Sequence, residues 1–243
     1  MDLVIDIGNT LQKVAVFSEE GVLLDLFSEK KLSISFLKTL FRQYSIGRAI
    51  VSSVRKEDNP ALRWLEEKTQ LFRFSADCRL PIRLQYATPE TLGTDRIANA
   101  VGANALCPNR NVLSIMAGTC LVADFVNEKG EYLGGSIAPG VRMRFLALSQ
   151  FTARLPLVEP ETIDFFVGDS TGNSILSGVM NGITHEIDGM IRQYSKQYDH
   201  LKVILSGGDA GLIQNSIKNR IFAAQNPILV GLHKILKLNA STG

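Results

Sequence analysis

Residues 1–29, MDLVIDIGNTLQKVAVFSEEGVLLDLFSE, decide the fold. They contain three apolar runs, Leu3–Ile5, Lys13–Phe17 and Val22–Phe27. The turn residues Gly8-Asn9-Thr10 separate the first two runs, and Glu19-Glu20-Gly21 separate the second two. Short apolar runs joined by such turns are typical of antiparallel strands. We therefore predict that the chain begins with a three-stranded antiparallel meander.

The same pattern begins again after residue 111. Ile5-Asp6-Ile7-Gly8-Asn9-Thr10 aligns with Ile115-Met116-Ala117-Gly118-Thr119, and residues 17–21 align with residues 125–130. Two matches in register indicate a duplicated unit. We expect two domains, residues 1–109 and 110–243, with the polar stretch Pro108-Asn109-Arg110 at their boundary.

Helices and strands follow each meander and place both halves in the α/β class. Buried strands are expected at Ala49–Val54, Phe72–Phe74 and Leu201–Leu205. The helical periodicity, together with Pro and Asn punctuation, predicts helices at Ser33–Tyr44, from Asn59-Pro60, at Thr94–Leu106, Val141–Arg154 and Asn173–Tyr198, and from Asn226-Pro227. We expect each domain to be a mixed sheet flanked by helices.

The charge balance excludes a polyanion-coating protein. The chain has 243 residues, 26 basic and 24 acidic side chains, and a formal net charge of +2. Its densest basic stretch, Arg142, Arg144 and Arg154, fits a solvated helix face, so nucleic acid is not the expected partner. No run of about 18 apolar residues occurs, which argues against a membrane span.

The cysteines and the first residues predict a cytosolic protein. Cys78, Cys107 and Cys120 are odd in number and lack CxxC spacing, as expected for reduced thiols rather than a disulfide framework or a zinc site. Asp2 and Asp6 interrupt the region where a signal peptide would be basic and then apolar. The three histidines, at positions 185, 200 and 233, form no recognisable constellation.

Glycine turns at strand ends are the candidate phosphate sites. The motifs GxGxxG, GxxxxGK[ST] and HExxH are absent, which argues against the Rossmann, P-loop and zincin classes. Four glycine turns follow apolar runs: Asp6–Thr10, Ala117-Gly118-Thr119, Gly134-Gly135-Ser136 and Ser206–Asp209. Glycine leaves backbone N–H groups uncovered, so such turns can bind phosphate oxygens.

Two carboxylates stand beside such turns, and each has a simpler alternative. Asp6 ends an apolar strand, where it could ligate a phosphate-bound Mg²⁺ or merely cap the turn. Asp95, in Gly93-Thr94-Asp95-Arg96 at a helix start, could be a base beside an anion site, with Arg96 holding a carboxylate. Alternatively, Thr94 is the N-cap and Asp95 a favourable first-turn acid.

With these features, the chain resembles the type III pantothenate kinases, which are members of the acetate and sugar kinase, Hsp70 and actin superfamily. The resemblance implies two duplicated RNase H-like, actin-like ATPase domains. It extends over the whole chain and is carried by Asp6–Thr10 with Lys13, Ser52-Ser53-Val54, Tyr86, Gly93–Arg96, Ala117-Gly118-Thr119 with Asp124, Gly134–Gly140, Leu155-Pro156, Gly168–Thr171 with Ser177-Gly178, and Ser206–Asp209.

The resemblance implies transfer of the γ-phosphoryl group of ATP to pantothenate, the first step toward coenzyme A. Asp95 would accept the proton of the substrate hydroxyl, and Asp6 would lie near the Mg²⁺. The nucleotide would contact Asp6, Ile7, Gly8, Asn9, Thr10, Leu11, Gln12, Lys13 and Thr119. Pantothenate would contact Tyr86, Gly93, Thr94, Asp95 and Arg96, together with Thr171 of a neighbouring subunit.

A shared site of this kind implies a homodimer. Gly178 and Gly182, four residues apart on the helix Asn173–Tyr198, would permit a close helix contact, either across a subunit interface or in a crowded core.

The sequence departs from the family where an activating monovalent cation, K⁺ or NH₄⁺, is expected. The family has an aspartate directly before Ala-Gly-Thr and a threonine a few residues later, and this chain has Met116 and Val122. A thioether is a poor ligand for a cation that prefers oxygen. Either the cation site is built differently or it is missing.

Met116 also motivates a second hypothesis, a catalytically weak kinase-like protein that binds nucleotide or pantothenate as a regulator. A superfamily kinase acting on another small alcohol or acid is a third.

Overall fold

The computed structural model describes the chain except for residues 9–10, 54–58, 76, 224–225 and 241–243. The chain divides into two compact units. Unit 1 comprises Met1–Leu106 and Pro227–Gly243, and unit 2 comprises Cys107–Asn226.

The sheet of unit 1 begins with the predicted meander. Its strand order is β3-β2-β1-β4-β5, with β1–β2 and β2–β3 antiparallel and the other two neighbours parallel. The strands are β1 (Asp2–Ile7), β2 (Gln12–Phe17), β3 (Leu23–Glu29), β4 (Arg48–Ser53) and β5 (Gln70–Arg73).

Unit 2 repeats this topology. Five of its strands pair in the order β9-β8-β7-β10-β11, again with an antiparallel meander and two parallel neighbours. They are β7 (Val112–Ala117), β8 (Cys120–Val126), β9 (Glu131–Pro139), β10 (Lys202–Ser206) and β11 (Phe222–Ala223). The central strands β1 and β7 share one burial pattern, in which only the fifth residue keeps appreciable solvent contact.

The pairing register confirms the predicted duplication residue by residue. Asp6, the fifth residue of β1, lies opposite Lys13 of β2 and Ser52 of β4. Met116, the fifth residue of β7, occupies the equivalent place opposite Val122 of β8 and Ser206 of β10. The two copies therefore have the same strand pairing, but this position holds a carboxylate in unit 1 and a thioether in unit 2.

One predicted turn is wrong. Gly134-Gly135-Ser136 lies inside β9. Gly134 has φ +103° at a register shift in the β8–β9 pairing, and a Cβ on Gly135 would lie 1.8 Å from the carbonyl oxygen of Ala123. Glycine serves here for a bulge and for close backbone approach, which the sequence does not distinguish from a turn.

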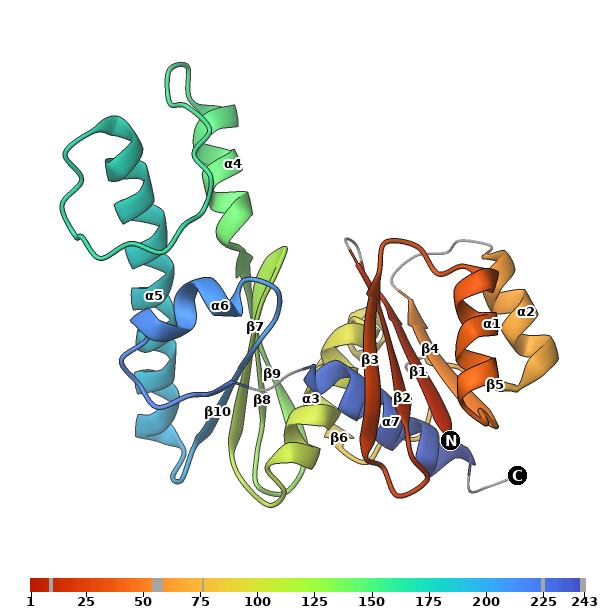
Figure 1. Cartoon of the computed structure of the whole chain (residues 1–243). Helices are drawn as coiled ribbons and strands as arrows, with labels where there is room; N and C mark the ends of the chain where they lie inside the picture. The colour runs from red at the N-terminus through yellow and green to blue at the C-terminus, as the bar shows by residue number, and fades with distance from the viewer. Residues whose placement is uncertain (9–10, 54–58, 76, 224–225, 241–243) are drawn as a thin grey trace. The chain divides into compact units, whose positions relative to one another are not determined.

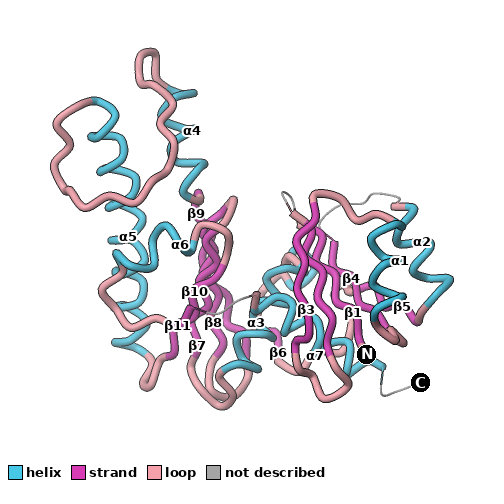
Figure 2. Tube along the Cα trace, in the orientation of Figure 1, coloured by secondary structure: helices cyan, strands magenta, loops and turns pink. Residues whose placement is uncertain are grey.

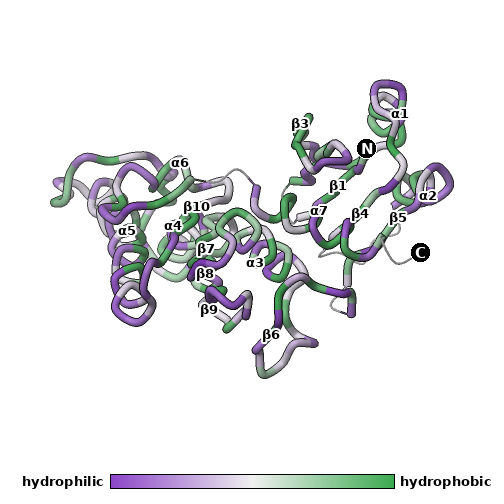
Figure 3. The backbone as a smooth tube through the Cα atoms, turned by 90° about the horizontal axis from the view of Figure 1, so that it is seen from below, coloured by the Kyte–Doolittle hydropathy of each residue, from purple (hydrophilic) through white to green (hydrophobic). Residues whose placement is uncertain are grey.

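The helices of unit 1 are α1 (Ile34–Gln43), α2 (Pro60–Lys68), α3 (Thr94–Leu106) and α7 (Pro227–Ala240), with a 3₁₀ turn at Pro89–Thr91 and a short strand β6 (Arg83–Leu84). Ser33 caps α1 and Asn59 caps α2 through side-chain oxygens. Both helices alternate hydrophilic and hydrophobic segments and lie on one side of the sheet (Figures 1 and 3). Their buried leucines pack on Leu3, Ile5 and Ile7 of β1.

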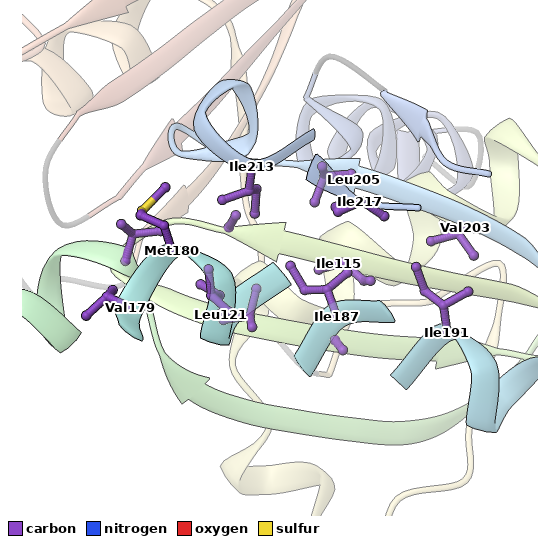
Figure 4. Close-up of a cluster of buried hydrophobic side chains, with 14 of the residues drawn as sticks. Ile115, Leu121, Val179, Met180, Ile187, Ile191, Val203, Leu205, Ile213 and Ile217 are labelled. Carbon is purple, nitrogen blue, oxygen red and sulfur yellow. The ribbon is translucent and has the colours of Figure 1, made fainter. Parts of the chain in front are cut away.

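The core of unit 2 lies between its sheet and the long helix α5 (Thr171–Gln197). Ile187 and Ile191 of α5 point toward Ile115 and Val203 of the sheet (Figure 4). The remaining helices are α4 (Val141–Phe151), α6 (Ala210–Ile213) and a 3₁₀ turn at Gln214–Ser216. Figure 2 shows the long loop that connects α4 with α5.

The last helix does not belong to the second half, where the predicted domain 110–243 placed it. α7 packs in unit 1, against α3, β1 and β4. The cause is a close helix crossing: a Cβ on Gly102 would lie 1.8 Å from the carbonyl oxygen of Pro227, and one on Gly231 would lie 1.8 Å from that of Ala98. Among the described residues, no helix has the length and hydropathy of a membrane span.

Candidate active site

A row of polar residues crosses the sheet of unit 1 where β1 ends. Asp6 stands between Lys13 and Ser52 on the two neighbouring strands. Side chains alternate between the faces of a strand, and Leu3, Ile5 and Ile7 pack toward α1 and α2. Asp6 and its two neighbours therefore point to the opposite face, on which α3 and α7 contact the sheet.

Burial shifts the ionisation of this row. It raises the pKa of Asp6 from 3.8 to about 6, while Lys13 opposes the rise and Asp95 adds to it. Burial also lowers the pKa of Lys13, and Asp6 opposes that change. Asp6 and Lys13 thus stabilise each other's charge, but not enough to offset the loss of water.

The N-terminus of α3 adds a second carboxylate to the row. The hydroxyls of Ser52 and Thr94 lie 3.4 Å apart, and the Asp95 carboxylate is near enough to Asp6 to raise its pKa. The alternative of Thr94 as N-cap is wrong, because α3 already begins at Thr94 and the carbonyl of Gly93 accepts a hydrogen bond from the amide of Ile97. Asp95 is therefore at the start of the first turn, where the helix dipole favours an anion.

Gly93 leaves room for the Asp95 side chain. A Cβ on Gly93 would lie 2.5 Å from Asp95 Oδ1, the same oxygen that accepts a hydrogen bond of 2.9 Å from the amide of Arg96. Any residue larger than glycine would push the carboxylate out of this position.

Arg96 and Tyr86 lie side by side next to this carboxylate. The Arg96 guanidinium carbon is 5.9 Å from the centroid of the Tyr86 ring, within cation–π range, and Arg96 is buried. The structure therefore brings together all five residues predicted to bind the substrate in unit 1, namely Tyr86, Gly93, Thr94, Asp95 and Arg96.

The described residues predicted to bind the nucleotide beside the β1–β2 turn have side chains that are apolar or engaged within the protein. Ile7 is part of the hydrophobic core, and the buried Gln12 accepts a hydrogen bond of 2.6 Å from the amide of Leu32 through Oε1. The Leu11 side chain is exposed. The predicted contacts at Asn9 and Thr10 lie outside the described residues.

Three glycine-containing segments converge at the matching end of the sheet in unit 2. A Cβ on Gly140 would lie 2.0 Å from the carbonyl oxygen of Gly118, and one on Gly207, at φ +102°, would lie 2.1 Å from that of Ala117. The amide of Gly140 donates to the carbonyl of Thr119. Gly118 itself faces open space among the described residues, so its backbone can approach a ligand.

The Asp6 carboxylate of unit 1 fits a Mg²⁺ ion that is bound together with ATP. Mg²⁺ is normally held by one or two carboxylates together with substrate phosphates. Asp6 supplies a half-buried carboxylate whose charged form lacks sufficient stabilisation in the protein alone. The described residues contain no cluster of three or more His, Cys, Asp or Glu that could hold a metal by themselves.

The residues at the expected cation position do not fit K⁺ or NH₄⁺. Met116 and Val122 are direct cross-strand partners on β7 and β8, and Val122 is buried. Neither side chain carries an oxygen, so this cross-strand pair supplies no side-chain ligand for a monovalent cation.

Two groups of residues stand outside this arrangement. Thr171 begins α5 in unit 2 and is exposed. In unit 1 the polar contacts among the buried Asp2 and His233 and the half-buried Arg48 were not predicted, because Asp2 and His233 are separated by 231 positions in the sequence and neither belongs to a recognisable motif.

Comparisons with known proteins point to one family. The family model for type III pantothenate kinase matches residues 2–193. A type III pantothenate kinase from Christiangramia forsetii is 42% identical over 240 residues, covering 98% of this chain and 99% of the relative. One from Cytophaga hutchinsonii is 41% identical over 248 residues, covering 98% and 100%.

A solved structure supports the fold. The activator of the 2-hydroxyisocaproyl-CoA dehydratase from Clostridium difficile, with bound ADPNP, is 12% identical and aligns with a TM-score of 0.52 over 100% of this chain and 98% of its own. The predicted actin-like ATPase fold is thereby confirmed.

Proposed function

The chain belongs to the type III pantothenate kinase family, and from that premise we propose that Asp6, Lys13 and Asp95 form its phosphoryl-transfer centre. The protein is an ATP-dependent kinase that converts pantothenate to 4′-phosphopantothenate. The observation that supports our assignment of residues is the row Lys13–Asp6–Ser52 with the Asp95 carboxylate beside it.

Asp95 is the proton acceptor in this proposal. As the hydroxyl oxygen of pantothenate forms its bond to the γ-phosphorus, the bond from that phosphorus to the β-phosphate oxygen breaks, ADP leaves, and the hydroxyl proton passes to Asp95. The amide of Arg96, donating to Asp95 Oδ1, fixes the orientation of the carboxylate. Positioning and charge neutralisation, rather than covalent chemistry, are what phosphoryl transfer requires of the protein.

Asp6 and Lys13 are the residues that we assign to the phosphates of ATP, Asp6 through Mg²⁺ and Lys13 directly. Mg²⁺ bound with ATP supplies neutralisation of the phosphate oxygens, and Asp6 is the residue of this chain that would hold it. A cation beside Asp6 would stabilise the ionised carboxylate, whose pKa burial raises to about 6. Lys13, directly opposite, would add a donor for phosphate oxygens.

Arg96 and Tyr86 are the residues we assign to the carboxylate end of pantothenate. Guanidinium groups bind carboxylates through paired N–H donors. Stacking against Tyr86 and burial hold the Arg96 side chain in one place, which reduces the entropy lost on binding.

We also infer that the working form is a homodimer formed through unit 2. In the α4–α5 loop, Phe166 is 70% and Val167 82% exposed, and Phe151 at the end of α4 is 85% exposed. On α5, a Cβ on Gly178 or Gly182 would meet nothing within 4 Å among the described residues, so this helix face is open to a close partner. A second copy would cover these apolar side chains and bring Thr171 of α5 toward the neighbouring site.

The monovalent cation has no part in our proposal, because Met116 and Val122 supply no ligand for it. Catalysis would then depend on Mg²⁺ alone. We place the reaction in the cytosol, which agrees with the free thiols at Cys78, Cys107 and Cys120.

A coupled assay of ADP release tests the proposal. The purified protein with ATP and Mg²⁺ is expected to release ADP only when pantothenate is added. Replacing Asp95 by Asn should lower kcat by about 10²- to 10⁴-fold, the usual contribution of a positioned base. The matched control is Asp77→Asn, an exposed carboxylate of the same unit, which should keep full activity.

Two outcomes would refute the assignment. ADP release that does not respond to pantothenate would contradict the reaction, and would favour ATP hydrolysis or another acceptor. Asp95→Asn with full pantothenate-dependent activity would contradict the role of Asp95 while leaving the reaction intact.

A further inference from the structure

A second polar row crosses the sheet of unit 1 at the opposite end of β1. Asp2 lies opposite Phe17 of β2 and Arg48 of β4. The Arg48 guanidinium donates Nε to Asp2 Oδ1 at 2.8 Å and a terminal nitrogen to Oδ2 at 3.1 Å. Asp2 is fully buried and Arg48 half-buried, so the carboxylate of this bidentate pair is shielded from solvent while the guanidinium keeps some contact with water.

His233 of α7 completes this row. Its Nε2 lies 3.0 Å from Asp2 Oδ2, and its ring stacks on Phe17 with centroids 4.3 Å apart. Burial lowers the pKa of His233, so the neutral ring donates this hydrogen bond to the carboxylate near pH 7. A turn further along α7, Lys237 Nζ donates to the carbonyl of Glu19. The helix is therefore fixed to the sheet by specific polar contacts as well as by apolar packing.

The same helix contacts α3 through glycine. A Cβ on Gly231 would lie 1.8 Å from the carbonyl oxygen of Ala98, and real Cβ atoms essentially never approach closer than 3.0 Å. Ala98 lies one turn from Asp95 in α3. The backbone of α7 thus sets the position of the first turn of α3 with no flexible side chain between them.

These contacts connect the two carboxylates of the proposed centre. Asp2 and Asp6 project from the same face of one strand, because they are four residues apart. Asp2 holds α7 through His233, α7 holds α3 through Gly231, and α3 carries Asp95. None of these contacts involves a residue that we assign to the phosphates or to the substrate.

We propose that His233 and Gly231 are positioning residues that set the distance between Asp6 and Asp95 for phosphoryl transfer. This inference rests on the function proposed above. It assigns a catalytic purpose to the C-terminal helix, whose residues lie at the other end of the sequence from Asp6.

Two changes test the two contacts of α7, the one with α3 through Gly231 and the one with β1 through His233. Gly231→Ala requires α3 and α7 to separate by about 1 Å, and a misplacement of that size can cost about 100-fold in kcat. The KM for ATP should stay within about twofold, since Lys13 and the phosphate turns are untouched. His233→Leu removes the hydrogen bond to Asp2 and should lower kcat by a smaller factor, whereas His233→Gln keeps an N–H donor and should restore it.

Lys234→Ala is the matched control, because Lys234 is the exposed neighbour of His233 on the same helix. Each variant is assayed well below its unfolding temperature, with kcat corrected for the folded fraction. A second readout does not need activity: hydrogen exchange of the Ile97 amide, which donates to the carbonyl of Gly93 in the first turn of α3. We expect this exchange to become faster in Gly231→Ala and to stay unchanged in Lys234→Ala.

The outcomes separate this inference from the proposed function. Loss of kcat, faster exchange of the Ile97 amide and rescue by His233→Gln support the inference. Folded Gly231→Ala or His233→Leu protein with wild-type kcat and unchanged exchange overturns it. If Gly231→Ala does not fold, the comparison of His233→Leu with His233→Gln decides. Wild-type protein without pantothenate-dependent ADP release would refute the proposed function, and the exchange measurement would still test whether α7 positions α3.

Discussion

Replacing Asp6 by Asn should stabilise the nucleotide-free protein while abolishing its activity. The folded protein raises the pKa of Asp6 from 3.8 to about 6, chiefly by burial, so it favours the neutral carboxyl over the charged one. One pKa unit corresponds to about 1.36 kcal/mol, so ionised Asp6 costs up to ~3 kcal/mol of folding free energy. Asparagine has nearly the same shape and carries no charge.

The sign of the effect fixes its pH window. Below about pH 4, Asp6 is protonated in both the folded and the unfolded chain, and the two proteins should be equally stable. Between pH 3.8 and about 6 the folded state binds more protons than the unfolded state, so the stability of the wild type falls as pH rises. Above about pH 6 the difference should reach its full value, with Asp6→Asn the more stable.

Trp64 provides the assay. It is the single tryptophan, lies on α2 of unit 1 and packs edge-on against Phe41, so its fluorescence reports on the unit that contains Asp6. Urea unfolding in EDTA, at several pH values, gives the free energy of unfolding. With an m value of about 2 kcal/mol/M, the midpoint of Asp6→Asn at pH 7.5 should be about 1.5 M higher.

Two results would refute this reasoning. One is a stability difference between Asp6→Asn and wild type that does not change between pH 4 and pH 7.5. The other is a less stable Asp6→Asn protein at pH 7.5, which would mean that Lys13 more than offsets the burial of Asp6. Asp77→Asn, exposed on the same unit, should show no pH-dependent difference.

Three further outcomes are expected. Lys13→Met removes the charge that lowers the pKa of Asp6, so the acidic limb of the kcat profile against pH should move to higher pH; a limb that stays in place would contradict the coupling. Wild-type ADP release should be equal within about twofold in KCl and in choline chloride, since Met116 and Val122 offer no oxygen, and strict dependence on K⁺ would mean that other residues build a cation site. Gly182→Leu should shift the protein from dimer to monomer in light scattering without lowering its unfolding temperature, because its Cβ meets no other described residue of its own chain; an unchanged dimer would place the interface elsewhere.

Local patterns in the sequence were sufficient to predict most of the helices and strands. The alternation of apolar residues and the glycine turns predicted both meanders, and the pairing of Asp6 with Lys13 and of Met116 with Val122 shows that the two copies were aligned correctly. Such patterns lie within windows of about ten residues, where strand and turn preferences are set by neighbours.

The same windows misjudge glycine. Gly134-Gly135 has the composition of a turn, but both residues lie within β9. Position 135 requires glycine because the carbonyl of Ala123 on the neighbouring strand leaves no room for a side chain. The demand for glycine there comes from a neighbour in space rather than in sequence.

By itself, then, the sequence determined the α/β class and the duplication, and it predicted Asp6 and Asp95 as the residues to which we assign the chemistry. Only the tertiary structure decided that the last helix returns to the first unit, that His233 meets Asp2 across 231 positions, and that Gly231 meets Ala98. The physical reason is the range of the interactions. Turn chemistry and periodicity act between neighbours in sequence, whereas burial, ion pairing and helix crossing depend on which distant segments the folded chain brings into contact.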